Sequence, residues 1–314
     1  MAGKRNILVT GGAGYLGSIM VPKLLAAGHA VTVLDSFMFR QMPFGHVCHE
    51  PGITIVRGDA REAATLRPLV QKADVVIPLA ALVGAPICER DPTGAVTTNR
   101  DAIRTLVEML STDQLIVTPI SNSGYGIGEK GKYCTEETPL RPVSLYGRTK
   151  VEAEAIALGH ANSISLRLAT VFGMSPRMRL DLLVNDFTYR AVFDHAVVLF
   201  EAHFKRNYIH VRDVARAFMH AMSRSADMRG QAYNVGLSDA NLSKLELCEA
   251  IARHVPGFVC TQSNIAEDPD KRDYIVSNAK IEATGFKPKF SLDDGIGELV
   301  KGYQMFARTP HGNA

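Results

Sequence analysis

A glycine-rich turn near the start of the chain constrains its fold more than any other feature. The turn joins Asn6–Thr10, which reads as a short buried strand, to Tyr15–Ala27, which has the pattern of a helix. It contains Gly11, Gly14 and Gly17. In such a turn the first glycine permits the tight bend, the second lets the backbone approach a phosphate, and the third allows the helix to pack closely against the strand. Because free N–H groups and the dipole at a helix start favour anions, the sequence predicts a phosphate-binding turn.

An acidic residue follows this turn at the spacing that dinucleotide-binding proteins use. Asp35 ends the next predicted strand, Ala30–Leu34, about 20 residues after the glycines. Its carboxylate would bind the ribose hydroxyls of an adenosine and repel a 2′-phosphate, so we expect NAD rather than NADP. A turn that serves packing alone is the alternative. Asp59 follows a third strand, and it either contacts the adenine or caps the next helix. The residues expected to bind NAD here are Gly11, Gly14, Tyr15, Leu16, Gly17, Asp35, Asp59 and Ala60.

Short apolar runs alternate with helical patterns through the first half of the chain. Further strands are predicted at Ile53–Arg57, Asp74–Leu79, Gln114–Ile120 and Ser163–Leu168, and helices at Glu62–Gln71, Ala102–Leu110 and Tyr146–Gly159. Apolar strands that alternate with helices are typical of a parallel sheet covered on both faces. We therefore expect an α/β fold with a Rossmann-type doubly wound parallel sheet.

The regularity weakens after Gly173, where the segments become shorter and richer in loops. We predict a smaller C-terminal substrate domain that is interleaved with the first. Residues 1–173 form the dinucleotide-binding domain and residues 207–230 return to it, while residues 174–206 and 231–314 form the second domain.

Composition argues against several other classes of protein. The 314 residues are 46% hydrophobic and 21% charged, which is ordinary for a globular protein. A net charge of +3 is too small and too dispersed to predict a nucleic-acid or anionic-membrane partner, and the apolar runs are too short to span a bilayer. The start of the chain lacks an apolar signal segment and the five cysteines are scattered, so we expect a cytoplasmic protein with reduced thiols. His46, Cys48 and His49 lie in one loop at a spacing unsuited to a tetrahedral site, and no metal is expected.

A tyrosine and a lysine share one face of a predicted helix. Tyr146 and Lys150 are four residues apart, which places their side chains one turn from each other. A free tyrosine is a poor base near neutral pH, but a neighbouring ammonium and a positive nicotinamide ring would lower its pKa. The phenolate would then take the proton of a substrate hydroxyl while hydride leaves the same carbon for NAD. The same spacing is common on surface helices, so its meaning depends on the glycine-rich turn and on a third partner.

Two serines are candidates for that partner. Ser121 and Ser123 lie just after the predicted strand Gln114–Ile120, and ligands of such sheets bind beyond the carboxyl ends of the strands. A hydroxyl there can hydrogen-bond the reacting oxygen. The alternative is that both serines only form the turn.

Together these segments resemble the extended short-chain dehydrogenase/reductase family of NAD-dependent nucleotide-sugar epimerases and dehydratases. The resemblance covers nearly the whole chain. It implies that Ser121 acts with Tyr146 and Lys150 in catalysis and that the substrate is a nucleotide-diphosphate sugar. Implied cofactor contacts are Leu79, Ala80, Ala81, Tyr146, Lys150 and Asn99, the last at the head of a helix. Implied substrate contacts are Ser121, Ser123, Asn185, Arg206 and Arg272. For the asparagine and the two arginines, a helix cap or a solvated charge is the alternative, although a guanidinium suits phosphate geometry.

Several positions depart from the family's pattern. The 4,6-dehydratases carry Asp-Glu after the catalytic Ser/Thr, where this chain has Asn122 and Ser123. Neither side chain can act as a carboxyl acid or base, which argues against dehydration. Asn207 replaces the usual Asp after Arg206, and Ala169–Gly173 lacks the Asn of the family's Asn-Val-Tyr-Gly segment. These changes leave the hydride chemistry intact and the substrate identity open.

A closer resemblance, to the GDP-D-glycero-α-D-manno-heptose 4-dehydrogenases of capsule and heptose-modification pathways, rests on Ala80–Pro86, Asn122–Lys130, Ser175–Arg179 and Glu267–Arg272. It implies oxidation at C4 of a GDP-sugar to a 4-keto sugar with formation of NADH. A 4-epimerase uses the same three catalytic groups and is the nearest alternative, and a non-catalytic NAD-binding protein is a remote one. The helices Ala102–Leu110 and Tyr146–Gly159 resemble those that pair in family dimers, so a homodimer is expected.

Overall fold

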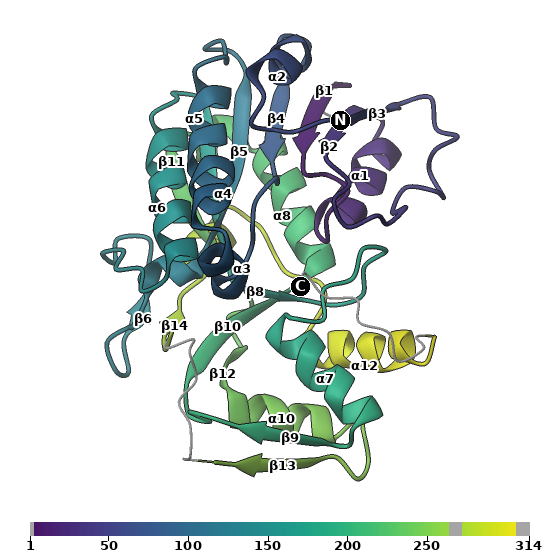
Figure 1. Cartoon of the computed structure of the whole chain (residues 1–314). Coiled ribbons are helices and arrows are strands. Elements are labelled where there is room, and N and C mark those ends of the chain that lie inside the picture. Colours follow the sequence, from purple (N-terminus) through teal and green to yellow (C-terminus); the bar gives the residue numbers. More distant parts are fainter. Residues whose placement is uncertain (1–2, 264–271, 306–314) are drawn as a thin grey trace.

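The chain folds around a parallel sheet of seven strands (Figure 1). The computed structural model describes residues 3–263 and 272–305. The strand order is β11-β7-β5-β4-β1-β2-β3, and every neighbouring pair is parallel. The strands are β1 (Asn6–Thr10), β2 (Ala30–Asp35), β3 (Ile53–Arg57), β4 (Val75–Pro78), β5 (Leu115–Ser121), β7 (Ser163–Leu168) and β11 (Gln231–Val235). This confirms the doubly wound α/β sheet expected from the sequence.

The strand order reverses beside β1, and this reversal decides where a ligand can bind. From β1 the chain runs outward through β2 to β3, and it then returns to β4 on the other side of β1. In open α/β sheets, ligands bind beyond the carboxyl ends of the strands at such a reversal. The glycine-rich turn after β1 and the segment after β4 therefore border the same crevice.

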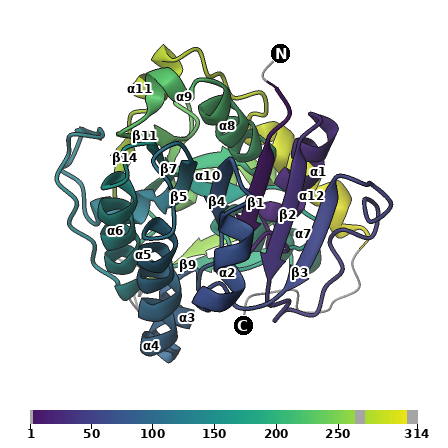
Figure 2. The same ribbon diagram turned by 90° about the horizontal axis from the view of Figure 1, so that it is seen from above.

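Helices cover both faces of the sheet because alternate residues of its strands are buried on opposite sides. Ile7 and Val9 of β1 belong to the core cluster that includes α1 (Gly17–Ala26) and α8 (Val211–Ser223). Leu8, between them, packs with α2 (Ala63–Val70) and α5 (Ala102–Val107). The helix α6 (Leu145–Leu158) lies beside α5 and against β5 and β7, as the view in Figure 2 shows.

The smaller sheets and three longer helices form a smaller lobe, most of it in the lower half of Figure 1. One small sheet contains β8 (Thr170–Phe172), β10 (Lys205–His210) and β12 (Asn241–Ser243), while β9 (Ala196–Leu199) pairs with β13 (Val259–Gln262) and β6 (Tyr133–Cys134) with β14 (Ile275–Val276). The longer helices here are α7 (Leu183–Phe193), α10 (Lys244–Ala252) and α12 (Leu292–Tyr303). The short helices lie beside the large sheet. They are α3 (Ala85–Arg90) and α4 (Pro92–Val96) against α6, α9 (Ser225–Met228) against α8, α11 (Ala279–Ala283) against β11, and the single turns Thr97–Asp101 and Asn122–Tyr125. Among the residues described, no helix combines the length and apolar character needed to cross a membrane.

One domain boundary predicted from the sequence is wrong. The sequence places residues 231–314 in the second domain, but β11 (Gln231–Val235) pairs with β7 and forms one edge of the large sheet. This strand is short and contains a glutamine and an asparagine, so it lacks the apolar signal of the other strands. The last strand of the large sheet therefore follows much of the second domain in the sequence.

The helix predicted at Ala102–Leu110 begins earlier than expected. Asp91 caps α4 by accepting a hydrogen bond of 2.8 Å from the Gly94 N–H, and α4 continues through one π-helical turn, Thr97–Asp101, into α5. Asn99 lies within this turn. The prediction that Asn99 stands at the head of a helix is therefore wrong, and its side chain points from the middle of a continuous helical run.

Candidate active site

The glycine-rich turn has the shape that a dinucleotide requires. Gly11 has a φ of +67°, and a Cβ built on it would lie 2.4 Å from the Ala80 backbone nitrogen, so no other residue fits there. A Cβ on Gly17 would lie 2.1 Å from the Gly12 carbonyl oxygen, which brings the first turn of α1 onto the glycine-rich turn itself. A Cβ on Gly14 would meet only the Gly11 carbonyl oxygen, at 3.1 Å. The position of Gly14 is therefore open to a diphosphate, and these residues fit the expected cofactor.

The carboxylate of Asp35 lies at the end of this turn. One of its oxygens accepts a hydrogen bond of 2.9 Å from the Ala13 N–H, and the other accepts one of 2.8 Å from the Phe37 N–H. These bonds fix the carboxylate beside the turn, and each oxygen keeps acceptor capacity for a ribose hydroxyl. A contact of Asp35 with the ribose of NAD stays a prediction.

Asp59 binds Arg61, two residues further along the chain. Its carboxylate accepts hydrogen bonds of 2.5 to 3.0 Å from the Arg61 guanidinium and one of 2.9 Å from the Arg61 N–H. The side-chain hydrogen bond from Arg61 holds the pKa of Asp59 below its usual value. Glu62, and not Asp59, occupies the cap position of α2. The helix-cap alternative is therefore wrong, and a contact of Asp59 and Ala60 with adenine stays a prediction.

Asn99 positions the segment that follows β4. Its side chain accepts a hydrogen bond of 2.8 Å from the Leu82 N–H and donates bonds of 2.9 Å to the Leu82 carbonyl and 3.3 Å to the Thr149 hydroxyl. It is 1% exposed. The asparagine thus ties the segment Leu79–Leu82, which lies against Gly11, to the helix that carries Tyr146.

The helix α6 is anchored at its first turn, where Tyr146 lies. The Ser144 hydroxyl caps the helix by accepting a hydrogen bond of 3.1 Å from the Gly147 N–H. A Cβ on Gly147 would lie 3.3 Å from the Ser123 carbonyl oxygen. The glycine after the tyrosine therefore lets the start of α6 pack against the turn that carries Ser121.

Ser121 and Tyr146 meet at the carboxyl end of β5. The Ser121 hydroxyl accepts a hydrogen bond of 3.1 Å from the Ser123 N–H, and the Ser121 side chain is one of the influences that lower the pKa of the Tyr146 phenol. Ser123 and Asn122 are 1% exposed, and within the described residues the Ser123 hydroxyl and the Asn122 amide have no hydrogen-bond partner. A substrate contact of Ser123 stays a prediction.

Burial and positive charge shift the pKa of Tyr146 in opposite directions. Burial raises the pKa of the phenol, while the charges of Arg179 and Arg272 lower it. The net shift is upward. The positive charges that lower this pKa belong to two arginines of the smaller lobe. A lowering by the Lys150 ammonium and a nicotinamide ring stays a prediction.

Lys150 lies one turn further along α6 and is 6% exposed. Burial lowers the pKa of its ammonium to about 8, while the charge of Glu154 opposes this shift. The lysine therefore keeps its proton at neutral pH by a small margin. Cys88 of α3 lies nearby, and burial raises the pKa of its thiol to about 11, so that it is uncharged at neutral pH.

Two arginines of the smaller lobe, Arg179 and Arg272, act on Tyr146, and a substrate contact of Arg206 and Arg272 stays a prediction. Arg206 is 3% exposed, its guanidinium lies 5.6 Å from the ring centroid of Tyr274, and Tyr274 is two residues from Arg272. Arg179, which sequence reasoning missed, pairs with the Asp181 carboxylate through two hydrogen bonds. Its only sequence signal is the basic, proline-containing segment Ser175–Arg179.

Asn185 holds the connection between β8 and α7 in place. Its side chain accepts a hydrogen bond of 3.0 Å from the Gly173 N–H and donates bonds of 2.9 Å to the Arg179 carbonyl and 3.2 Å to the Tyr15 hydroxyl. The Tyr15 hydroxyl in turn donates a bond of 2.6 Å to the Gly173 carbonyl. The structure thus gives Asn185 and Tyr15 a bracing role, and a phosphate contact of Asn185 stays a prediction. Residues 267–271 of the segment Glu267–Arg272, on which the closer resemblance partly rests, lie outside the described residues.

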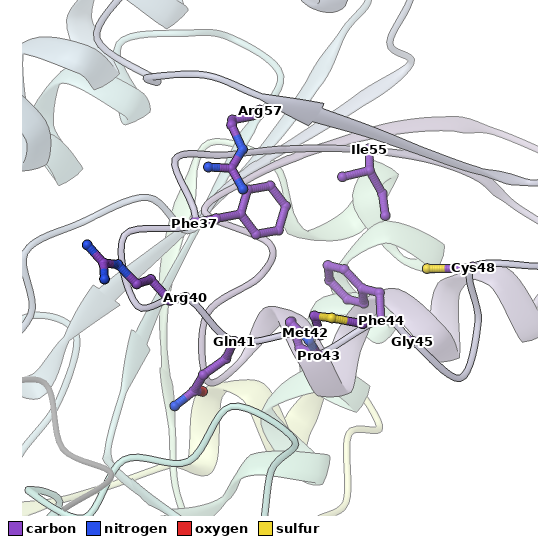
Figure 3. Close-up of a pocket in the computed structure, with 10 residues that line it drawn as sticks. All are labelled: Phe37, Arg40, Gln41, Met42, Pro43, Phe44, Gly45, Cys48, Ile55 and Arg57. Atoms are coloured by element: carbon purple, nitrogen blue, oxygen red, sulfur yellow. The ribbon is translucent and has the colours of Figure 1, made fainter.

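A separate pocket of about 370 Å³ lies under the connection from β2 to β3. Figure 3 shows it between Phe37, Phe44 and Ile55, with the Arg57 guanidinium 5.2 Å from the ring centroid of Phe37. Cys48 lines the same pocket. Within residues 3–263 and 272–305, no three His, Cys, Asp or Glu side chains lie close enough to hold a metal ion.

The fold and the site together define an NAD-dependent enzyme, in which a tyrosine, a lysine and a serine border a dinucleotide cleft. Residues 7–236 match the model of the NAD dependent epimerase/dehydratase family, and the chain belongs to this family.

Relatives and solved structures support this assignment. Over 95% of its length the chain is 30% identical to the low-salt glycan biosynthesis protein Agl12 of Haloferax volcanii, of which it covers 98%. It is also 30% identical to a dTDP-glucose 4,6-dehydratase of Streptomyces griseus, over 95% of this chain and 94% of that one. The fold matches the UDP-glucose 4-epimerase of Thermus thermophilus, solved with NAD, with a TM-score of 0.79, 24% identity, and coverage of 96% of this chain and 100% of that one.

Proposed function

We propose that this enzyme oxidises the C4 hydroxyl of a nucleotide-diphosphate sugar, and that its substrate is GDP-D-glycero-α-D-manno-heptose. The observation that carries the proposal is the meeting of the Ser121 hydroxyl and the Tyr146 phenol beside the glycine-rich turn, with Arg179 and Arg272 supplying positive charge. When bound, NAD supplies a hydride acceptor and a positive ring in this cleft.

The chain's own groups then move one proton. The Ser121 hydroxyl orients the C4 hydroxyl by a hydrogen bond, and the Tyr146 phenolate accepts its proton as the C4–H bond breaks. Since burial raises the pKa of Tyr146, the phenolate needs nearby positive charge, which Arg179, Arg272 and the ammonium of Lys150 provide. The product is a 4-keto sugar, and the hydride leaves on NADH.

Arginines of the smaller lobe would hold the nucleotide end of the substrate. Arg206 and Arg272 are proposed to bind its diphosphate, because a guanidinium offers paired donors to phosphate oxygens. The proposal is supported by the position of Arg206, whose guanidinium lies 5.6 Å from the ring centroid of Tyr274, two residues after Arg272. Ser123 and Asn185 are proposed to complete the substrate contacts.

The names of the relatives point to carbon 4. The 4,6-dehydratase and the 4-epimerase both carry this position in their names. Inversion at a hydroxyl-bearing carbon requires its C–H bond to break, and a ketone at C4 makes the neighbouring C5 proton acidic enough for elimination. Oxidation at C4 is therefore a step that both reactions can share, and Asn122 and Ser123 argue against the elimination that follows it in a dehydratase.

A 4-epimerase is the second candidate, because the chain shares full-length fold similarity with the UDP-glucose 4-epimerase and retains the same three catalytic groups. Product analysis separates the candidates. We would incubate the enzyme with NAD and GDP- or UDP-sugars and examine products by mass spectrometry and NMR. Loss of two hydrogens with NADH formation supports the dehydrogenase, an isomer of unchanged mass supports the epimerase, and loss of water would contradict both.

We also propose that the protein is a homodimer that pairs through α5 and α6. These helices lie side by side on one face of the sheet, and Glu152 of α6 pairs at 3.2 Å with Arg100 of the helical turn that precedes α5. Light scattering after size exclusion gives the mass in solution. A monomer at micromolar concentration would contradict this proposal.

A further inference from the structure

Tyr125 ends the short helical turn that follows Ser121. Ser121 is the cap residue of this turn, Asn122–Tyr125, and Tyr125 at its other end is 2% exposed. A Cβ built on Gly124 would lie 3.0 Å from the Val151 side chain of α6, so the turn packs directly against the helix that carries the proposed base. Because the turn is so short, the position of Tyr125 bears on the position of the Ser121 hydroxyl.

The Tyr125 hydroxyl is held from several sides. It donates a hydrogen bond of 2.7 Å to the side-chain oxygen of Asn234 and accepts one of 3.0 Å from the Arg167 guanidinium. The Asn234 amide nitrogen donates to the Ser277 carbonyl at 3.1 Å, which leaves the amide oxygen facing the phenol. The Thr135 carbonyl oxygen also lies 3.0 Å from the phenol oxygen. These contacts fix the place of the hydroxyl and the direction of its proton.

Arg167 connects this hydroxyl to the helix α6. Its guanidinium donates hydrogen bonds of 2.9 and 3.0 Å to both oxygens of the Glu154 carboxylate, and both side chains are buried. Glu154 lies on α6, one turn beyond Lys150 and on the same face. Buried polar groups that satisfy one another make a local arrangement rigid. Tyr125 is thus tied, through two side chains, to the helix that carries Tyr146.

The Tyr125 phenol does not itself exchange a proton near neutral pH. Burial raises its pKa to about 12, although the charge of Arg167 and the hydrogen bonds from Arg167 and to Asn234 lower it. The phenol therefore keeps the proton that it donates to Asn234, and its hydrogen bonds persist over the neutral range. Tyr125 can act on the reaction only through the placement of its neighbours.

We propose that Tyr125 is a positioning residue, whose hydroxyl holds the turn after β5 so that the Ser121 hydroxyl stays beside the Tyr146 phenol. This inference rests on the catalytic roles proposed for Ser121 and Tyr146. Without the hydroxyl, the turn loses its bonds to Asn234 and Arg167, and Ser121 is no longer fixed relative to α6. The role does not depend on which nucleotide sugar the enzyme oxidises.

The pH profile of kcat tests this role, because the Ser121 side chain lowers the pKa of the Tyr146 phenol. Ser121→Ala removes that influence, so its rising limb should move to higher pH. Tyr125→Phe keeps the ring and removes only the hydroxyl. Its rising limb should move in the same direction, and kcat at neutral pH should fall about three- to tenfold, which corresponds to one hydrogen bond. The affinity for NAD, measured by calorimetry, should not change, because the glycine-rich turn is untouched.

The variant that combines both substitutions separates positioning from a general loss of order. If Tyr125 acts through Ser121, Tyr125→Phe should have little further effect on kcat and on the pH profile once residue 121 is alanine. Independent effects would instead multiply as fold-changes. Multiplied effects would overturn the positioning role, as would a wild-type profile of Tyr125→Phe beside a shifted profile of Ser121→Ala. A wild-type profile of Ser121→Ala would remove Ser121 from the proposed reaction, and the positioning role with it.

Tyr208→Phe is the matched control. Tyr208 of β10 is also a buried tyrosine, and in the part of the chain that the structure describes its hydroxyl has no hydrogen-bond partner. Its replacement should leave kcat and the pH profile unchanged. Asn234→Ala keeps the test decisive should Tyr125→Phe fail to fold, because it removes the acceptor of the phenol proton and leaves Tyr125 in place. A wild-type pH profile of Asn234→Ala in that case would overturn the proposal.

Discussion

The Asn99 amide reaches the Thr149 hydroxyl at 3.3 Å and so joins the segment after β4 to the catalytic helix. The same amide makes two hydrogen bonds to the backbone of Leu82 and donates a long one to the Cys88 sulfur. This one side chain therefore fixes the distance between a wall of the cofactor cleft and the helix that carries Tyr146. The relationship arises because the helix of Asn99 contains a π-helical turn that directs the residue inward.

Replacement of Asn99 should destabilise the protein. In Asn99→Ala, the buried N–H and carbonyl of Leu82 lose their partners, at a cost of about 1–3 kcal/mol for each unsatisfied group. Denaturant unfolding measures this difference. Thr149→Val removes only the bond to the Thr149 hydroxyl and should cost less. Equal stability of Asn99→Ala and wild type would show that the amide does not brace this segment.

Tyr146→Phe should abolish turnover and leave cofactor binding intact. The variant removes the proton acceptor, and general-base catalysis contributes about 10²–10⁴ in rate. NAD affinity should change little, since the phenyl ring keeps the packing at the start of α6. Initial rates with the active nucleotide sugar and calorimetry with NAD check the two halves of this prediction. Turnover at the wild-type rate would remove Tyr146 from the mechanism.

Arg179→Met should move the pH profile of kcat/KM to higher pH. Burial raises the pKa of Tyr146, and the charge of Arg179 is the first of the influences that lower it. Removing this charge raises the pKa further, so the fraction of phenolate at a given pH falls and the rising limb shifts to the alkaline side. Arg179→Lys preserves the charge and serves as the control. A profile of Arg179→Met that overlays the wild type would contradict this arrangement.

Glu154→Gln should both destabilise the fold and shift the alkaline limb. Glu154 is 3% exposed and accepts hydrogen bonds of 2.9 to 3.0 Å from the Arg167 guanidinium. Breaking such a buried pair costs about 3–5 kcal/mol. The negative charge of Glu154 also raises the pKa of Lys150, which burial lowers to about 8, so without this charge Lys150 loses its proton at lower pH.

The matched control is Ser165→Ala, which removes a hydrogen bond to the Glu154 carboxylate and keeps its charge. Its alkaline limb should stay near that of the wild type. A pH titration of kcat and a denaturant curve on both variants separate the two effects. An alkaline limb that does not move in Glu154→Gln would mean that Lys150 does not limit the rate there.

The sequence predicts the parts of the fold that depend on local pattern. The strand Asn6–Thr10 is recognisable because a parallel strand buries both of its faces and its middle is continuously apolar. In Ser163–Leu168 apolar residues alternate with Ser163, Ser165 and Arg167, which are buried as well. The glycine-rich turn was equally clear, since Gly11 and Gly17 meet backbone atoms that leave no room for a side chain. Tyr146 and Lys150 were predicted as the catalytic pair because they are four residues apart on a helix and the chain also carries the glycine-rich turn.

The parts that could not be predicted depend on contacts between distant segments. The charge of Arg179 at Tyr146 requires the fold of the smaller lobe, which no periodicity reveals. The strand β11 pairs with β7 from a position more than sixty residues later, and its short polar sequence carries no strand signal. The position of Asn99 within a π-helical turn is likewise set by packing rather than by propensity.

Because β11 lies far beyond β7 in the sequence, the chain cannot be divided into two simple fragments. A fragment that ended after β8 would leave the edge of β7 open to other chains, and a fragment that began there would hold β11 without a sheet to join. Neither piece is a self-sufficient folding unit. The large sheet and the smaller lobe cannot be separated by cutting the chain at one place, because β11 completes the sheet after most of the smaller lobe in the sequence.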